Sequence, residues 1–488
     1  MTQSKESSTY VKTNSDITYN YRTNIKNIKG VGFNMKGKIT SLLLVGITCI
    51  SLLSGCGGKA PATSSVPSDV NKEVTGSKKD EAKVDTAEKK TIKFLSIWPE
   101  DKDNSKLILE LTEEYKKENP NFNMEFEYIA SGDLTSKIKV LLASDDLPDV
   151  FAYESGAPLK ELIDVGAVAD MGESLDKIGM RDSLDEGALD LLESLVDGSG
   201  VYALPLGLNI EGIWYNKELF SQAGVTGEPT TWDELIDACE KLKAAGIQPF
   251  VAGGKDKWPL TRLINMHLIR NVGPDAMQKV MEKQAKLTDP EYVEAARAIQ
   301  EMANKGYFGQ GITTVDQGTA TSMLMNGQGA MFYNGSWMVE DLTSDANAAG
   351  EDGIGYFNIP TVAGGKGTLD EYSMNCGNII AFAADKYDDA TAGWVEYVFT
   401  RMGDKAMTDY GAFKGYKINN MPSEVSNYTQ LVGDHIAGAK GSALWYEARF
   451  DTKTSKMAQD LSQLLFNNEM TPEDYMESLQ QSIDENIK

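Results

Sequence analysis

The sequence is well supplied with residue types that bind uncharged, hydroxylated molecules. Its seven tryptophans can stack on apolar C–H faces, and its carboxylates and amides can form paired hydrogen bonds with hydroxyl groups. Patterns typical of catalysis do not occur in it: there is no nucleophile elbow, P-loop or His-Glu-x-x-His, and two histidines are too few for a histidine zinc site. The residue types therefore favour a binder of neutral sugars that needs no cofactor or metal and is not an enzyme.

Two candidate ligand residues follow the first predicted strand. Residues 91–97 alternate in polarity and are rich in β-formers, which is typical of a strand. Ligands of α/β proteins bind beyond the carboxyl ends of strands, so Trp98 and Glu100 are candidates for contact with the sugar. The alternative for Trp98 is packing against the helix that follows.

Two more candidates lie after a second strand and after a polar loop. Glu154 ends the short strand 149–153, where it could bind hydroxyl groups or cap the helix that follows Pro158. Trp258 comes directly after the loop 253–257, whose Gly, Lys and Asp residues suit the rim of a cleft better than a core. Trp258 is therefore expected at the edge of a binding cleft.

The elements that must position these residues predict two α/β lobes. With 488 residues, the chain is long enough for two packed domains. Residues 91–153 alternate strand, helix, strand, helix and strand, which favours a mostly parallel sheet covered by helices. Past residue 210 the pattern becomes helical: Thr231-Trp232-Asp233-Glu234 has capping-box spacing, and Asp289-Pro290 is typical of a helix start.

Several other aromatic residues have patterns typical of a core. Trp214 alternates within an apolar strand-like run, Trp232 falls in the first turn of a helix, and Trp394 shares a helical face with Val398. His267 stands among large apolar residues, so a buried core histidine is the preferred interpretation. We expect these residues to stabilise the fold and not to bind ligand.

The cysteines favour neither redox chemistry nor zinc. None of the four forms a C-x-x-C pair, and Cys49 falls in the apolar leader described below. A disulfide between Cys239 and Cys376 is compatible with an exported protein, but two buried free thiols are the preferred interpretation.

The N-terminal region resembles a lipoprotein export signal. A pair of lysines precedes the apolar run Ile39–Leu53, which is short for a membrane span and has the length of a secretory signal. It ends in Leu53-Ser54-Gly55-Cys56, which resembles the lipobox of bacterial lipoproteins, where cleavage precedes a lipidated cysteine. The alternative is an ordinary cysteine after a chance apolar segment. The order of charge, apolar core, small residues and cysteine favours the lipoprotein.

The residues on either side of this signal have no folding pattern. A signal peptide normally begins at the start codon, so we expect Met35 to be the initiator and residues 1–34 to be untranslated or disordered. Residues 35–55 are then the signal peptide, and 56–90 are the lipidated cysteine and a flexible linker, because polar and small residues cannot bury enough surface to fold. This arrangement predicts an extracytoplasmic protein held to the cell membrane by lipid.

Charge excludes a further class of partner. The whole chain has a net charge of −25, and removal of the first 55 residues, with seven Lys/Arg and two Asp/Glu, leaves −30. So acidic a surface repels phosphate backbones and anionic lipid headgroups, so nucleic acid is not an expected partner.

Seven short segments, each weak alone, together resemble a known family. In chain order they are Tyr115–Pro120, Leu147–Phe151, Tyr202–Pro205, Trp214–Phe220, Thr230–Leu235, Asn326–Met331 and Asn334–Trp337. In this order they resemble the extracellular solute-binding proteins, the family that includes maltose-binding protein, over roughly residues 91–450. The resemblance implies a monomeric, two-lobed periplasmic-binding-protein-like fold of type II with a ligand cleft between the lobes. It also implies hinged closure and delivery of the ligand to the permease subunits of an ABC importer.

The resemblance implies lobe boundaries and further site residues. The N-terminal lobe would comprise 91–207 plus about 372–415, and the C-terminal lobe 208–371 plus about 416–488. The implied ligand-binding residues are Asn209 and Glu211 at the first crossing, Trp337 as the stacking tryptophan, Asn375 near the second crossing, and Trp445. Asn209 matches an acidic sugar-binding position of maltose-binding protein, so the change from acid to amide argues against maltose itself.

Three other functions stay open from the sequence. A cell-surface glycoside hydrolase would need two carboxylates roughly 5–10 Å apart, and the acidic residues are too numerous to exclude such a pair. A binder of peptides or charged solutes could share the architecture, and an arginine facing the ligand, with Arg262 or Arg270 as candidates, would indicate an anion. A sensory or adhesive surface lipoprotein is the third.

Overall fold

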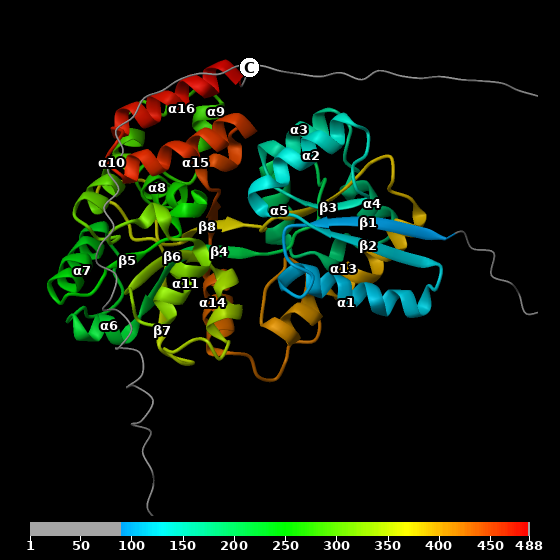
Figure 1. Ribbon diagram of the computed structural model, residues 1–488, viewed down its shortest axis with the longest axis horizontal. Coiled ribbons are helices and arrows are strands. Elements are labelled where there is room, and N and C mark those ends of the chain that lie inside the picture. Colours follow the sequence, from blue (N-terminus) through cyan, green and yellow to red (C-terminus); the bar gives the residue numbers. More distant parts are fainter. Residues whose placement is uncertain (1–88, 487–488) are drawn as a thin grey trace, which may run out of the picture. The chain divides into compact units, whose positions relative to one another are not determined.

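The computed structural model describes residues 89–486, which belong to one compact unit. Two β-sheets, each flanked by helices, make up this part of the chain (Figure 1). The predicted α/β class with two sheet-centred lobes is confirmed. The predicted signal peptide, Cys56 and nearly all of the linker lie outside the described residues.

The first lobe is built around a four-stranded sheet of order β2-β1-β3-β9. β1 pairs in parallel with β2 and β3, and β9 is antiparallel to β3. Its elements are β1 (Lys90–Ser96), α1 (Asp103–Glu118), β2 (Phe122–Tyr128), α2 (Leu134–Ala143), β3 (Val150–Tyr153), α3 (Ala157–Asp164), α4 (Met171–Lys177), α5 (Glu186–Leu195), β9 (Ile379–Phe382) and α13 (Asp389–Tyr410). The predicted strand, helix, strand, helix, strand order of residues 91–153 is confirmed.

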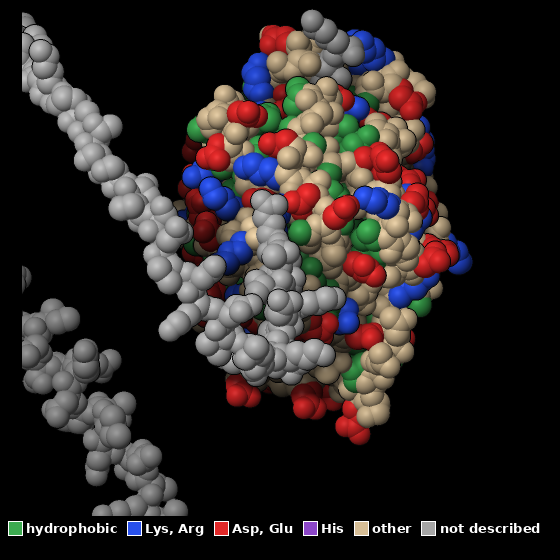
Figure 2. Space-filling view, turned by 90° about the vertical axis from the view of Figure 1, so that its right-hand side faces the viewer, with side chains coloured by type: hydrophobic (Ala, Val, Ile, Leu, Met, Phe, Trp, Pro, Cys, Tyr) green, Lys and Arg blue, Asp and Glu red, His purple; other side chains and the backbone are tan. Residues whose placement is uncertain are grey.

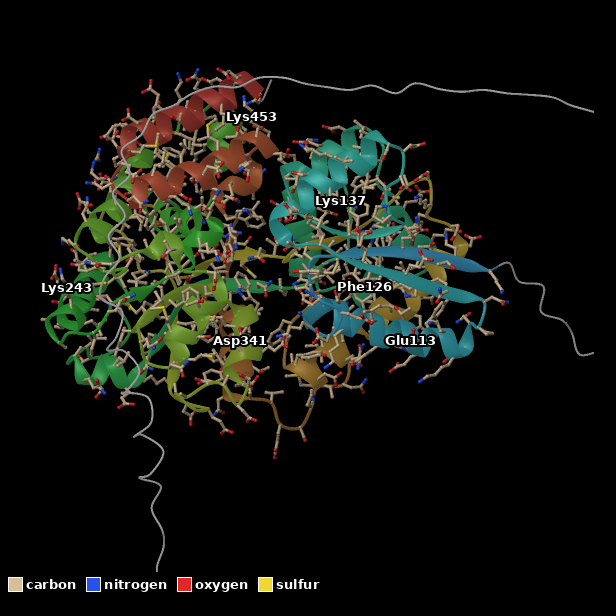
Figure 3. All side chains as sticks on the ribbon, viewed as in Figure 1. Glu113, Phe126, Lys137, Lys243, Asp341 and Lys453 are labelled. Atoms are coloured by element: carbon tan, nitrogen blue, oxygen red, sulfur yellow. The ribbon has the colours of Figure 1, made fainter. Side chains whose placement is uncertain are left out.

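The alternation of the sequence explains how this sheet packs. In β1, Ile92, Phe94 and Ser96 are fully buried, Thr91 and Lys93 on the other face are exposed, and Leu95 on that face is buried where the strand approaches its carboxyl end. Phe94 meets Phe126 of β2 edge to face, with ring centroids 5.7 Å apart (Figure 3 labels Phe126). β1 runs from the N-terminal edge of this lobe toward the second lobe, so its carboxyl end points at the middle of the molecule (Figure 1).

The second lobe is built around a six-stranded mixed sheet of order β10-β8-β4-β6-β5, with β7 also pairing with β4. Its strands are β4 (Asn209–Asn216), β5 (Phe250–Val251), β6 (Met331–Gly335), β7 (Ile354–Phe357), β8 (Glu371–Asn375) and β10 (Gly441–Ala443). Its helices are α6 (Lys217–Gln222), α7 (Trp232–Ala244), α8 (Trp258–Asn271), α9 (Ala276–Met281), α10 (Pro290–Asn304), α11 (Gln317–Met325), α12 (Val339–Leu342), α14 (Asn427–Gly438), α15 (Thr452–Phe466) and α16 (Pro472–Asn486). Short 3₁₀ turns include η3 (Gly254–Asp256), η5 (Ser336–Met338) and η6 (Tyr446–Arg449).

Helix starts in this lobe follow the predicted chemistry. α7 has a complete capping box, in which Thr231 accepts from the backbone of Glu234 and the Glu234 carboxylate accepts from the backbone of Thr231. α10 begins at Pro290 after Asp289, although the Asp289 carboxylate accepts from the backbone of Lys286 and not from the helix.

Within the described residues, the chain passes three times between the sheets, through 205–208, 376–378 and 411–426. The last of these joins α13, which packs on α1, to α14, which contacts β4 and α12. β8 ends at Asn375 within the second sheet, and β9 begins at Ile379 within the first. Side chains near these passages can therefore be shared between the lobes.

Of the residues predicted to be structural, Trp214, Trp394 and His267 are buried, and Trp232 is half-buried. Trp214 and Trp394 have no exposed surface, and His267 is 3% exposed with its ring edge-on to Trp232. Burial lowers the pKa of His267 to about 4, so its imidazole is neutral at pH 7. Cys239 and Cys376 are both buried free thiols, in agreement with the preferred interpretation.

No helix among residues 89–486 combines the length and apolar character needed to cross a membrane. On the face shown in Figure 2, acidic and basic side chains alternate and no broad basic area is visible.

Candidate ligand-binding site

Three predicted polar residues meet on adjacent strands of the second sheet. Asn209 and Glu211 are two residues apart on β4 and so lie on the same face, and Asn375 is paired with Asn209 on the neighbouring β8. The Asn209 amide donates to Oδ1 of Asn375 at 3.2 Å, and the Asn375 amide donates to Oε1 of Glu211 at 2.7 Å. All three are buried. The result is a rigid polar chain where β8 leaves this sheet for the first lobe.

Glu211 lies at the centre of this arrangement. It is 1% exposed and accepts hydrogen bonds from Tyr333 at 3.3 Å and Ser373 at 3.4 Å. Burial, followed by the charge of Glu211, raises the pKa of Tyr333 well above its ordinary value, so the phenol stays a donor. The Arg262 Nε lies 3.5 Å from Oε1 of Glu211 and offsets its charge.

Arg262 lies beside Trp258 and Trp445, and Trp337 packs on Trp258; we call these four residues, Trp258, Trp337, Trp445 and Arg262, the tryptophan cluster. The guanidinium carbon of Arg262 lies 4.4 Å from the ring centroid of Trp445 and 5.8 Å from that of Trp258. The Trp258 and Trp337 rings meet at 66° with centroids 6.1 Å apart. Trp337 is 37% exposed, although most large apolar side chains of the fold are buried. An exposed indole is a platform on which a sugar ring can stack.

Glu447 joins the tryptophan cluster from η6. It is 5% exposed, accepts a hydrogen bond from the Thr261 hydroxyl, and has its other oxygen 4.0 Å from Nη1 of Arg262. Burial raises the pKa of Glu447, and the charge of Arg262 opposes that rise. Sequence reasoning did not single out Glu447. The only signal was its position two residues after Trp445.

Glu154 approaches Arg262 from the first lobe. It follows β3 and is half-buried, and burial raises its pKa while a hydrogen bond with Asn378 and the charge of Arg262 lower it. The predicted alternative of helix capping is not seen, since α3 has Gly156 at its N-cap without a side-chain cap. Groups from both lobes therefore act on one guanidinium.

Arg262 and Glu447 keep unused hydrogen-bonding capacity in this site. Among the described residues, Nε and Nη1 of Arg262 and Oε2 of Glu447 are buried without a hydrogen-bond partner. Buried polar atoms are normally paired, so a set of two donors and one acceptor beside tryptophan rings is suited to a ligand that offers both kinds of group. Hydroxyl groups do so.

Charge at the site favours an uncharged ligand. Arg262 faces the site, and an arginine there would by itself favour an anion. Three carboxylates, those of Glu154, Glu211 and Glu447, lie around it. Arg270 is fully buried and donates to the backbone oxygens of Ile359, Thr368 and Glu371, so it is a structural residue. An incoming carboxylate or phosphate would meet a net negative cluster.

The two remaining candidates, Trp98 and Glu100, have their contacts outside the tryptophan cluster. Trp98 is half-buried and packs on the main hydrophobic core, while its backbone is hydrogen-bonded to Ser96 and Ser105. Glu100 is exposed and lines a groove along α1 with Lys106 and Glu110. The ligand contact predicted for these two stays a prediction.

The family follows from sequence comparison. Residues 98–405 match the family model of the bacterial extracellular solute-binding proteins, and the chain belongs to this family. Such proteins act outside the cytoplasm and bind small solutes for ABC transporters; theirs is a transport family and not an enzyme family.

Two curated relatives illustrate the range of similarity. An uncharacterized ABC transporter extracellular-binding protein of Pyrococcus horikoshii is 22% identical over 369 residues, which cover 74% of this chain and 76% of the relative. The multiple sugar-binding protein of Streptococcus mutans is 26% identical over 306 residues, 62% of this chain and 64% of the relative.

Solved structures share the same fold. A chitin oligosaccharide binding protein superposes with a TM-score of 0.73 and 24% identity, covering 81% of this chain and 98% of its own. A protein from work on xylan utilization by Caldanaerobius polysaccharolyticus has a TM-score of 0.72 and 26% identity, covering 80% of this chain and all of its own.

Proposed function

We propose that this protein binds a neutral mono- or oligosaccharide at the tryptophan cluster and delivers it to the permease subunits of an ABC importer. The observation that carries this proposal is the exposed Trp337 ring packed on Trp258, whose own ring lies beside an arginine with its charge offset by buried carboxylates. Indole rings stack on the apolar face of a pyranose, and Arg262 and Glu447 offer free donors and an acceptor to its hydroxyl groups.

The names of similar proteins support a sugar as ligand. The Streptococcus mutans relative is a multiple sugar-binding protein, and the superposed structures include a chitin oligosaccharide binding protein and a protein in complex with raffinose. Chitin oligosaccharide and raffinose are neutral sugars, in line with the charge argument.

Binding is proposed to close the lobes around the sugar. Glu154 comes from the first lobe and the tryptophan cluster from the second, so a ligand that contacts both has more interactions in the closed form. The three chain passages between the sheets would act as the hinge. The closed form presents both lobes to the permease.

A lipid anchor completes the proposal. Cys56 follows the apolar leader and would carry the lipid, and residues 57–88 would tether the binding lobes to the membrane as a monomer. The test is radiolabelled palmitate incorporation in a bacterial host. Label in the wild-type chain and none in Cys56→Ser is the expected result, and equal labelling of both would contradict the anchor.

A panel of sugars tests the proposed ligand class. At least one neutral sugar should stabilise the protein without the leader and change its tryptophan fluorescence. At a sugar concentration of 100 times the Kd, the free energy of unfolding should rise by about 2.7 kcal/mol. The matched uronic acid of that sugar is the control and should have a much smaller effect, because the carboxylates around Arg262 repel it. A flat response to every neutral sugar, or release of reducing ends from a polysaccharide, would overturn the proposal.

A further inference from the structure

A pocket of about 170 Å³ lies beside the tryptophan cluster, between the two lobes. Ser194 of α5 in the first lobe lines one side, and α8, α9 and the segment 442–449 of the second lobe line the rest. We call it the Asn265 pocket, after the residue of α8 that contributes to its lining. Nothing in the proposed contacts of the tryptophan cluster uses this space.

The Asn265 pocket continues the binding site along one face of α8. Trp258, Arg262, Asn265 and Ile269 are spaced by four, three and four residues, which places them in one stripe of the helix. Trp258 and Arg262 belong to the tryptophan cluster, whereas Asn265 and Ile269 line the pocket. The tryptophan cluster and the Asn265 pocket therefore lie next to each other, against successive turns of one face of α8.

A second segment is shared in the same way. Trp445 and Glu447 contact Arg262, while Leu444 and Arg449 line the Asn265 pocket. The Trp445 segment thus forms the border between the tryptophan cluster and the pocket. A ligand longer than one unit can reach from one to the other along α8.

Asn265 identifies the chemistry of the pocket. It is fully buried, and neither its amide nitrogen nor its amide oxygen has a hydrogen-bond partner among the described residues. Such a side chain is costly to the fold unless a bound molecule supplies both a donor and an acceptor. A hydroxyl pair on a sugar supplies both.

The other lining groups favour an uncharged ring. Leu268, Ile269, Met277 and Leu444 present apolar surface. The charged groups are already paired, since Arg449 contacts Asp197 at 2.6 Å and Asp275 contacts Lys279 at 2.7 Å. The volume of about 170 Å³ is well above what a single water needs and leaves room for a small ring.

We propose that the Asn265 pocket is a subsite for a second neutral pyranose unit, so that the ligand is an oligosaccharide of at least two units. The inference rests on the proposed sugar-binding function and adds ligand length to it. Because Ser194 and the Asp197 partner of Arg449 belong to the first lobe, the subsite is complete only when the lobes are together. The second unit therefore adds affinity and favours closure.

Calorimetric titration with sugars of increasing length tests the subsite. The probes are one-, two- and three-unit members of the xylose, N-acetylglucosamine, glucose and galactose series, on protein without the leader. For the series that binds, wild type should prefer two units to one, and Asn265→Leu should weaken binding of two or three units about tenfold or more. Binding of the single unit should stay within about twofold.

Two further variants keep the test interpretable. Asn271→Leu on the same helix, whose amide donates to Glu291 outside the pocket, is the control and should show no length-dependent effect. Ser194→Trp fills the pocket from an exposed position of the first lobe and should reproduce the loss for longer sugars even if Asn265→Leu folds poorly.

The outcomes separate the subsite from the underlying function. Equal affinity of wild type for one and two units, or equal loss by Asn265→Leu at every length, overturns the subsite while sugar binding stands. No binding of any probe by wild type overturns both.

Discussion

The second lobe places the whole tryptophan cluster and two buried glutamates at the candidate site, whereas the first lobe approaches Arg262 with Glu154. Both lobes have a tryptophan near the start of a helix. Trp258 begins α8 beside Trp337, but Trp98 packs on the main hydrophobic core. The difference indicates that affinity resides mainly in the second lobe, and that the first lobe contributes by closing over a ligand already bound there.

Arg262→Met tests the second lobe most severely. It leaves Glu211 and Glu447 buried without their cation and should lower the free energy of unfolding by roughly 3 kcal/mol at pH 7.5. Burial raises the pKa of Glu447 above its unfolded value, and loss of the Arg262 charge raises this pKa further. A carboxyl group with a raised folded pKa favours the folded state at low pH, and this contribution to the free energy of unfolding is lost as the pH rises through the folded pKa. The deficit should therefore shrink at pH 4.5.

Scanning calorimetry at the two pH values measures this effect. Arg401→Met, which removes an exposed arginine of α13 in the first lobe, is the control and should change stability little at either pH. A deficit for Arg262→Met that is the same at both pH values would show that the carboxylates are not responsible.

Trp337→Ala and Trp98→Ala compare the two lobes directly. Loss of the exposed Trp337 ring should weaken sugar binding about tenfold, or about 1.4 kcal/mol, with little change in stability. Loss of Trp98 should cost about 2 kcal/mol of stability, because its ring packs on the core, and should weaken affinity less than loss of Trp337 does. Titration calorimetry and urea unfolding distinguish the two. A larger affinity loss in Trp98→Ala than in Trp337→Ala would reverse the comparison.

Glu154→Gln measures the contribution of the first lobe. At pH 7.5 it should weaken sugar binding about threefold, because a carboxylate that faces Arg262 becomes an amide. Burial raises the pKa of Glu154, so wild type itself loses this charge on acidification, and the two proteins should bind alike well below that pKa. Glu173→Gln on α4, whose residue is exposed, is the control for titration calorimetry. A difference that persists at acid pH contradicts the charge argument.

Asp197→Asn should have the smallest effect. Asp197 pairs with Arg449 across the lobes at 2.6 Å, but its side chain is 58% exposed, so the pair is worth less than about 1 kcal/mol. The expected result is a slight loss of affinity for longer sugars that disappears in 1 M salt. A larger loss of affinity that persists in 1 M salt would indicate that the contact between Asp197 and Arg449 stabilises the closed arrangement of the lobes, and does not act only at the rim of the Asn265 pocket.

Local patterns in the sequence determined much of the fold. The alternation of residues 91–97, the capping box at Thr231 and the Asp289-Pro290 helix start all depend on neighbours within a few positions, and the structure has each element. The two-residue spacing of Asn209 and Glu211 likewise dictated that they share one face of β4.

Tertiary structure alone decided which candidates meet. Trp98 and Trp258 both had local patterns suited to a cleft, yet one packs on a core and the other joins Arg262, because the neighbours of each ring come from elements distant in sequence. Glu447 reaches Arg262 because the chain returns to α8 after its third passage between the lobes. The charge of that arginine is offset by carboxylates that are distant in sequence and lie within a few ångströms of it only in the folded protein. No local pattern encodes this arrangement, so the preference for a neutral ligand could not be read from the sequence.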